Sequence, residues 1–423
     1  LTRAASGNGT SNQKFTMSLW IKKSSNDSAV RRLIELYNTS AYYVSFRFRD
    51  DSSNRLDFYS ESNGSSVNLR TNRSFRDLSA WYHLMMVVDT TLATADDRMK
   101  MYVNGVQETS FALRTNPGSS ENLNFNNSGD NQLISISQNA SNTENDRKFN
   151  GYMSEVCFID GLALAADSFG EFDEDSGIWK PIDVSGLTFG TNGFYLDFED
   201  SGALGDDVSG NGNDFTVNNL TAIDQSTDTC TNNFCTLNPL VRYTANPTFT
   251  EGNLSFTGGG GSDFAGALGT IAMTQGKWFW ECKISATLTN TLVGVQQVGL
   301  NLNTSEPQNI TGGTTCFYNN DGGEMKTDGT ATTNDYGTFS GTDIMGVAVN
   351  MDDKQMSIYK NGSAIISNFA LSASSTEVLP FFAMYSSGAI ANFGNPPFTI
   401  SSGNADGNGY GNFEYAVPSG YYA

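Results

Sequence analysis

Histidine is nearly absent from this 423-residue sequence, which contains only His83. A Ser-His-Asp triad would have to use that residue, and a histidine-rich zinc site cannot be assembled. His83 lies within residues 80–88, where aromatic side chains give way to aliphatic ones in the manner of a β-strand. We therefore predict a structural histidine near the start of a strand.

Cysteine is also scarce, with five residues and no Cys-x-x-Cys pair, which argues against zinc. A disulfide between the neighbouring Cys230 and Cys235 is one alternative, but free thiols are the expectation. Free thiols in a chain of this size fit assembly in a reducing cytoplasm.

Positive charge is in short supply, because 24 Lys and Arg face 45 Asp and Glu and leave a net charge of −21. Such a chain does not suit nucleic acid or an anionic membrane as its main partner. No apolar run approaches the roughly 20 residues that span a bilayer, so membrane insertion is not expected. The chain opens with Leu1 rather than Met and shows no basic and apolar leader, which suggests a piece of a longer protein.

Glycine and aromatic residues are plentiful, with 43 Gly, 28 Phe, 17 Tyr and 5 Trp. They occur in short segments of alternating apolar and polar residues, which predict β-strands separated by turns. In residues 15–22, for example, the alternation places Phe15, Met17, Leu19 and Ile21 on one face. Asn-Gly pairs at 104–105 and 361–362 predict type I′ hairpins.

These patterns predict an all-β chain with two antiparallel β-sandwiches joined by an acidic connector rich in Gly and Asp. The first sandwich is expected at 1–165, the connector at 166–238 and the second sandwich at 239–423.

Residues 1–165 resemble a laminin-G-like domain of the concanavalin A-like lectin/glucanase type. The resemblance rests on FTMSLWIKK (15–23), WYHLMMVVD (81–89), MKMYVNGV (99–106) and GYMSEVCFIDGLAL (151–164). It implies that part of the first strand precedes Leu1.

Residues 239–423 resemble a SPRY, or B30.2-like, domain through GKWFWECKI (276–284), FYNNDGGEMKTDG (317–329), IMGVAVNMDDKQMSIYKNG (344–362) and LPFFAMYSSGAIANFGNPPF (379–398). Both resemblances imply that the two antiparallel β-sandwiches are jelly-roll-like. The tandem resembles tail-fibre or other appendage proteins of marine bacteriophages.

Two acidic clusters support an alternative hypothesis, in which the protein is a glucanase-like glycoside hydrolase or polysaccharide depolymerase. The first is residues 171–175, and the second is Asp197 with Glu199, expected on one strand face. Both also fit a solvated acidic surface, and we expect no enzyme activity. Asp207, Ser209 and Asn211 have the spacing of the first ligands in a calcium loop. A turn of Asx and Gly residues is the expectation, and calcium is the alternative. No other cofactor is expected.

The resemblance implies a non-catalytic virion protein that is assembled in the host cytoplasm and binds a host cell-surface glycan or envelope protein. Other virion subunits are expected partners, and a homotrimer is the expected assembly. The predicted ligand surface comprises loops 317–329 and 333–342, with Tyr318, Asn320, Asp321, Asp335 and Tyr336. A SPRY-type adaptor that binds a peptide is the second alternative.

Overall fold

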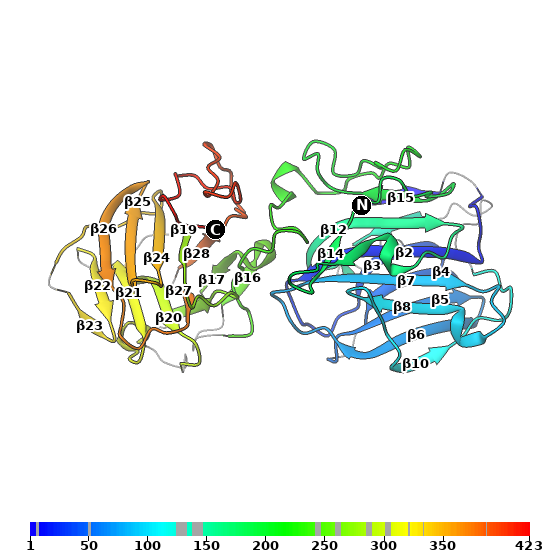
Figure 1. The fold of residues 1–423 in the computed structure, drawn as a ribbon, viewed down its shortest axis with the longest axis horizontal. Coiled ribbons are helices and arrows are strands. Elements are labelled where there is room, and N and C mark those ends of the chain that lie inside the picture. The colour runs from blue at the N-terminus through cyan, green and yellow to red at the C-terminus, as the bar shows by residue number, and fades with distance from the viewer. Residues whose placement is uncertain are drawn as a thin grey trace. The chain divides into compact units, whose positions relative to one another are not determined.

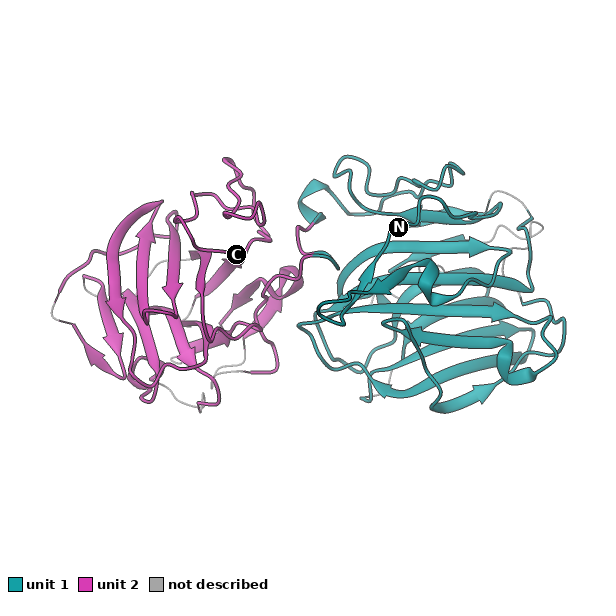
Figure 2. Cartoon of the chain, in the orientation of Figure 1, with its two compact units in different colours: residues 1–225, 229–231 teal, residues 226–228, 232–423 magenta. Residues whose placement is uncertain are grey.

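The computed structural model describes residues 1–5, 8–49, 52–123, 133–137, 147–241, 247–258, 264–284, 290–300, 306–319, 322–332, 334–385 and 387–423. The chain divides into two compact units, shown in different colours in Figure 2. Unit 1 contains residues 1–225 and 229–231, and unit 2 contains residues 226–228 and 232–423. Both are built from antiparallel sheets, which confirms the predicted all-β fold. No helix in these ranges is long and apolar enough to cross a membrane.

Unit 1 contains a seven-stranded sheet in the order β1-β11-β3-β4-β5-β6-β10 and a six-stranded sheet in the order β15-β12-β2-β7-β8-β9 (Figure 1). A hairpin of β13 and β14 lies outside them. The elements are β1 Thr2–Ala4, β2 Lys14–Lys23, β3 Arg31–Thr39, β4 Tyr42–Phe48, β5 Arg55–Ser62, β6 Ser65–Ser74, β7 Trp81–Asp89, η1 Ala95–Asp97, β8 Met99–Val103, β9 Val106–Gln107, β10 Phe111–Thr115, β11 Leu133–Ile136, β12 Gly151–Asp160, η3 Ala166–Ser168, β13 Gly170–Phe172, β14 Trp179–Pro181, β15 Phe194–Leu196 and η4 Ala222–Asp224.

The core of unit 1 forms between these two sheets. The predicted face of β2 is confirmed, because Phe15, Met17, Leu19 and Ile21 are all buried in this core. The core also contains Phe46 and Phe158 from β4 and β12. The hairpin between β8 and β9 has positive φ at Asn104 and Gly105, 48° and 76°, as a type I′ turn requires.

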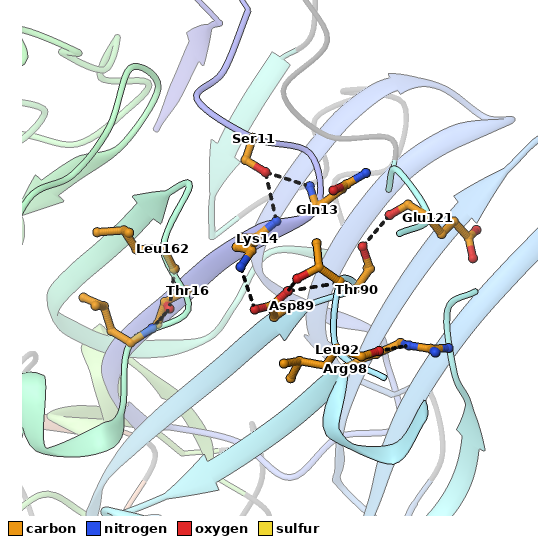
Figure 3. A network of polar contacts seen from close by, with 12 residues as sticks. Ser11, Gln13, Lys14, Thr16, Asp89, Thr90, Leu92, Arg98, Glu121 and Leu162 are labelled. Carbon is orange, nitrogen blue, oxygen red and sulfur yellow. Dashed lines mark hydrogen bonds and ion pairs between the residues drawn. The ribbon is translucent and has the colours of Figure 1, made fainter. Parts of the chain in front are cut away.

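Polar contacts hold one end of this sandwich (Figure 3). Lys14 on β2 pairs with Asp89 at the end of β7, with 3.0 Å between Nζ and Oδ2. The Thr16 hydroxyl donates to the carbonyl of Leu162 at 3.0 Å and accepts from the backbone N–H of Leu164 at 2.9 Å. These bonds attach the chain after β12 to the six-stranded sheet.

The outer face of the six-stranded sheet is covered by residues that follow β12. Trp20 and Trp81 of the sheet pack there with Phe169, Trp179 and Phe189 in a second apolar cluster. His83 is fully buried in the same layer, where the Trp179 indole N–H donates to its Nδ1 at 3.1 Å. Nδ1 is thus an acceptor, so the neutral ring carries its proton on Nε2, which lies 2.8 Å from the Ser18 hydroxyl. The predicted structural role of His83 is confirmed.

Unit 2 is a second sandwich, with sheets in the orders β16-β17-β28-β19-β24-β25-β26 and β18-β27-β20-β21-β22-β23 (Figure 1). Its elements are β16 Thr248–Thr250, η5 Glu251–Asn253, β17 Ser255–Thr257, β18 Phe264–Leu268, β19 Lys277–Ile284, β20 Thr291–Gln297, η6 Pro307–Asn309, β21 Thr314–Asn319, β22 Glu324–Thr327, β23 Thr330–Ala331, β24 Ile344–Asn350, β25 Gln355–Lys360, β26 Ser363–Ala370, β27 Val378–Tyr385 and β28 Gly388–Asn392.

Alternation along the strands of unit 2 separates a core from two outer faces. Trp280 and Val347 lie in the core, whereas Phe279 and Ala348 face outward and pack against Phe413 of the C-terminal segment. Glu281 holds this segment, because its buried carboxylate accepts the backbone N–H groups of residues 414 and 415 at 2.9 and 2.8 Å. The predicted second hairpin is confirmed by φ values of 47° at Asn361 and 78° at Gly362.

Candidate functional site

The two sandwiches present four outer sheet faces, and three of them carry an apolar cluster. One is the tryptophan-rich layer on the six-stranded sheet of unit 1, and another is the layer under the C-terminal segment of unit 2. The third lies on the six-stranded sheet of unit 2 and includes Leu292, Cys316 and Phe381. Among the described residues, no such cluster lies on the outer face of the seven-stranded sheet of unit 1. This fourth face is therefore the candidate site.

The strand alternation places polar and aromatic residues on this face. On β4, Val44 and Phe46 point into the core, so Tyr43, Ser45 and Arg47 point outward. The same alternation on β5 directs residues 57, 59 and 61 outward, since Phe58 is a core residue. The cross-strand register sets Arg47 opposite Asp57, Ser45 opposite Tyr59 and Tyr43 opposite Glu61.

A buried charge network lies at the base of the face. The Asp57 carboxylate, which is fully buried, accepts from Arg47 Nε and Arg70 Nε at 3.0 Å each. Asn68 Nδ2 donates to the same carboxylate at 3.0 Å. Arg32 forms a second buried ion pair with Glu35 on β3. A charge buried on a sheet face is costly unless it is paired, and both carboxylates here have arginine partners.

Tyrosine rings cover the arginines. The guanidinium carbon of Arg47 lies 4.7 Å from the ring centroid of Tyr59, and that of Arg32 lies 5.9 Å from the centroid of Tyr43. Both arginines are buried, with exposed fractions of 4–5 %, whereas both rings are partly exposed. The cations therefore lie beneath the rings, in the position favoured by cation–π attraction.

Tyr37 on β3 completes a row of three rings, which we call the tyrosine face: Tyr37, Tyr43 and Tyr59. The ring centroids are 6.3 Å apart for Tyr37 and Tyr43 and 5.6 Å apart for Tyr43 and Tyr59. All three rings are partly exposed. Successive strands thus present one aromatic ring each to solvent.

Polar groups border the rings at the β5 and β6 side. The Tyr59 hydroxyl donates to Glu61 Oε2 at 2.5 Å, and Glu61 Oε1 accepts from the Gly64 N–H at 2.9 Å. Desolvation, together with the hydrogen bond to Glu61, raises the pKa of Tyr59 to about 12, so the phenol stays protonated. Asn68 Oδ1 has no hydrogen-bond partner within the described part of the chain.

This arrangement combines exposed ring faces, an acceptor carboxylate and a fixed layer of paired charges. Rings of this kind stack on apolar C–H faces of a ligand, while the carboxylate accepts hydroxyl hydrogen bonds. This face was not predicted from the sequence. The signal was present in residues 42–48 and 55–62, where every outward position carries Tyr, Arg, Asp, Glu or Ser.

The predicted ligand residues of unit 2 occupy different surroundings. Tyr318 lies on β21 rather than in a loop, because residues 314–319 pair with β20 on one side and β22 on the other. Its side chain is buried, its hydroxyl donates to Asn290 Oδ1 at 2.5 Å, and Lys326 Nζ lies 5.0 Å from its ring centroid. Asn320 and Asp321 lie outside the described residues.

Asp335 and Tyr336 lie in the irregular segment after β23. Asp335 is exposed and accepts the backbone N–H of Gly337 at 3.0 Å, while Tyr336 hydrogen-bonds through its own N–H to the carbonyl of Gly323 at 3.0 Å. The segment thus lies against the β21–β22 turn. A ligand role for this surface stays a prediction.

The predicted calcium loop is held together by its own hydrogen bonds. Asp207 is buried, and its carboxylate accepts three backbone N–H groups, from Tyr195 and Asn213 at 2.8 Å and from Ser209 at 3.1 Å. Asn211 Nδ2 donates to two backbone carbonyls, those of residues 190 and 193, at 2.7 and 3.0 Å. Across the described ranges, no group of three or more His, Cys, Asp or Glu side chains is arranged to hold a metal ion. Calcium at this loop stays a prediction.

The two acidic clusters are placed as follows. Glu171 and Asp173 both pair with Lys180 at the β13–β14 hairpin, at 3.3 and 3.2 Å. The expectation that Asp197 and Glu199 share a strand face is wrong. Strand β15 ends at Leu196, and a φ of 63° at residue 198 turns the chain.

Comparison with known families identifies both modules. Residues 2–167 match the family model of the concanavalin A-like lectin/glucanases superfamily, and residues 277–396 match that of the SPRY domain. Both kinds of domain are therefore found in this chain, as the sequence resemblance implied. These are lectin-like and interaction families that are typically non-catalytic. No curated protein sequence matches the chain.

Solved structures of low identity are similar to parts of the chain. The SPRY domain of human HERC1 is 18 % identical with a TM-score of 0.32, and the match covers 37 % of this chain and 96 % of that one. A heptameric SAP-like pentraxin from Limulus polyphemus is 17 % identical with a TM-score of 0.28, covering 39 % and 71 %. A putative carbohydrate binding protein from Bacteroides ovatus is 16 % identical with a TM-score of 0.32, covering 47 % and 49 %.

Proposed function

We propose that this protein is a non-catalytic binding protein whose tyrosine face recognises a glycan on a cell surface. The observation that carries the proposal is the fourth outer sheet face, where three partly exposed rings form a row and two of them lie over paired arginines. The lectin-like match of the same unit is consistent with it. The arginines are held by carboxylates and rings before any ligand arrives, so binding requires little ordering of the site.

We further propose that the protein is a receptor-binding subunit of a bacteriophage tail fibre or appendage, located in the virion. The support is the resemblance of the tandem to such appendage proteins, together with two modules from families of binding domains. A host envelope protein is the alternative receptor, and the SPRY module is the candidate surface for it. The hydrolase alternative is tested by incubating the protein with polysaccharide and assaying new reducing ends.

The deciding experiment compares host-cell binding by the purified protein and by two tyrosine variants. Tyr43→Ala removes the central ring of the tyrosine face, and Tyr410→Ala removes an exposed tyrosine of unit 2. Loss of a central aromatic contact costs roughly 2 kcal/mol or more, so Tyr43→Ala should weaken binding by at least about tenfold. Tyr410→Ala should bind normally, and wild-type protein should compete with phage adsorption.

Tyr43→Phe serves as the matched folding control, because it keeps the ring over Arg32. It should retain most of the binding. Unchanged binding by a folded Tyr43→Ala variant would rule out the tyrosine face. If Asp335→Ala or Tyr336→Ala then removed binding, the site would instead lie on the SPRY module.

A further inference from the structure

We infer that the tyrosine face takes an uncharged, linear glycan of at least three sugar residues, laid obliquely across strands β3, β4 and β5. The inference deepens the proposed function and rests on it. Four features of the described residues carry it: the direction of the ring row, the spacing of the rings, the pairing of the arginines beneath them and the acceptor carboxylate beside them.

The direction of the row follows from the strand register. Tyr37 lies directly opposite Tyr43, whereas Tyr59 lies opposite Ser45 and is therefore diagonal to Tyr43. The three rings lie on three adjacent strands, so the row crosses the strands obliquely. An extended ligand that contacts all three rings must follow this direction, because each strand contributes one ring.

The spacing suits a repeating ligand. Centroid separations of 6.3 and 5.6 Å are close to the length of one sugar residue in an extended β-linked chain. Each ring can therefore stack on one sugar. The rings are tilted by 40° and 34° relative to their neighbours, so a chain that twists between successive sugars fits the row better than a flat one.

The charges favour a neutral ligand. Arg32 pairs with Glu35, and Arg47 and Arg70 both pair with Asp57. Arg32 and Arg47 are also buried beneath rings and paired with carboxylates. A sulfated or carboxylated glycan would find the arginines beneath the rings already paired, whereas a neutral sugar needs only ring faces and a hydroxyl partner.

A hydroxyl partner lies at the β5–β6 end of the row. Glu61 is partly exposed, and its carboxylate accepts hydrogen bonds from the Tyr59 hydroxyl and the Gly64 N–H. A carboxylate is an acceptor, which matches the O–H groups that line the edges of a sugar. The third sugar, over Tyr59, should therefore be held by hydrogen bonds as well as by stacking.

The test is isothermal titration calorimetry of the full chain with cello- and laminari-oligosaccharides of one to six glucose units. Oligogalacturonates of matched length supply the charged comparison. Affinity for a neutral series should rise about tenfold for each added sugar up to three and then level off. Ala variants of Tyr37, Tyr43 and Tyr59 should each weaken trisaccharide binding about tenfold, while Tyr410→Ala should not.

If cell binding still depends on Tyr43, the proposed function stands, and three outcomes would then overturn this inference alone. They are full affinity for a monosaccharide, tighter binding of the charged series, and no binding of any of these oligosaccharides. If cell binding is independent of Tyr43, the proposed function fails as well. Capture of a protein partner or self-association through Tyr43 would likewise overturn the inference, because the occupant would then be a polypeptide.

Discussion

His83 shows what a single residue contributes when it is buried among aromatic rings. The ring lies 5.0 Å from Trp20 and 5.9 Å from Trp179, centroid to centroid, and both of its nitrogens have partners. Desolvation lowers the pKa of His83 to about 3, compared with 6.5 for the free side chain, so the ring stays neutral in the folded protein. The unfolded chain takes up this proton near pH 6.5.

This difference predicts acid sensitivity of unit 1. Because the pKa of His83 is lower in the folded state, only the unfolded state binds this proton between pH 6.5 and 3. The free energy of unfolding is therefore unaffected by His83 protonation above pH 6.5, and it decreases as the pH falls from 6.5 towards 3. At about 1.4 kcal/mol per pKa unit, the loss across this window is on the order of a few kcal/mol. The free energy of unfolding of unit 1, measured by urea titration at pH 7.0, 6.0 and 5.0, should decrease at each step. His83→Gln should be less stable at pH 7 but have a flatter pH dependence, and parallel slopes for the two proteins would contradict this account.

At the scale of elements, the β8–β9 hairpin and the β14 strand support each other. Gly105 has a φ of +76°, and a Cβ atom there would lie 2.4 Å from the Trp179 ring. The absence of a side chain at this turn therefore allows the indole to pack over the hairpin and reach His83. Gly64, in the turn between β5 and β6, has a similar φ of +87° but open space around it.

Alanine substitutions at Gly64 and Gly105 separate the effect of backbone strain from that of packing. Gly64→Ala should lower the free energy of unfolding by roughly 1–2 kcal/mol, because alanine disfavours the left-handed conformation. Gly105→Ala should lower the free energy of unfolding by the same amount and by about 1–3 kcal/mol more, because the new methyl group overpacks against Trp179. Thermal unfolding gives the two values, and tryptophan fluorescence should change only for Gly105→Ala. Equal destabilisation by both substitutions would mean that the indole moves away without cost.

Elements with strong local signals were predictable from sequence, and those that depend on tertiary context were not. The alternation in residues 15–22 and both Asn-Gly turns were identified because strand period and turn chemistry act locally. The end of β15 at Leu196 was missed, because a left-handed Phe198 has no local signature. The tyrosine face was missed because its three rings come from three strands whose register only the folded sheet defines.

At the scale of the whole molecule, each chain offers one tyrosine face, and an open face of this kind binds one ligand segment weakly. Linked copies increase avidity by ~10²–10⁴ without new contacts, provided that the geometry lets them engage together. We therefore expect the homotrimer that the appendage resemblance implies. Light scattering after size exclusion should give three times the mass of one chain.

Dilution to a monomer should remove cell binding while leaving oligosaccharide affinity unchanged. A monomer that binds cells as tightly as the assembled protein would exclude avidity as the source of affinity.

The burial of Arg32 and Arg47 beneath rings also bears on how the protein adapts to new receptors. Replacing Tyr43 or Tyr59 by Phe or Trp leaves the arginines below covered, so such exchanges should be tolerated by the fold and change which sugars stack. Replacing Asp57 would instead leave two arginines without their carboxylate partner, and the sheet would lose stability. Receptor preference should therefore change through substitutions of the ring residues, while the ion pairs beneath the rings are retained in the variants.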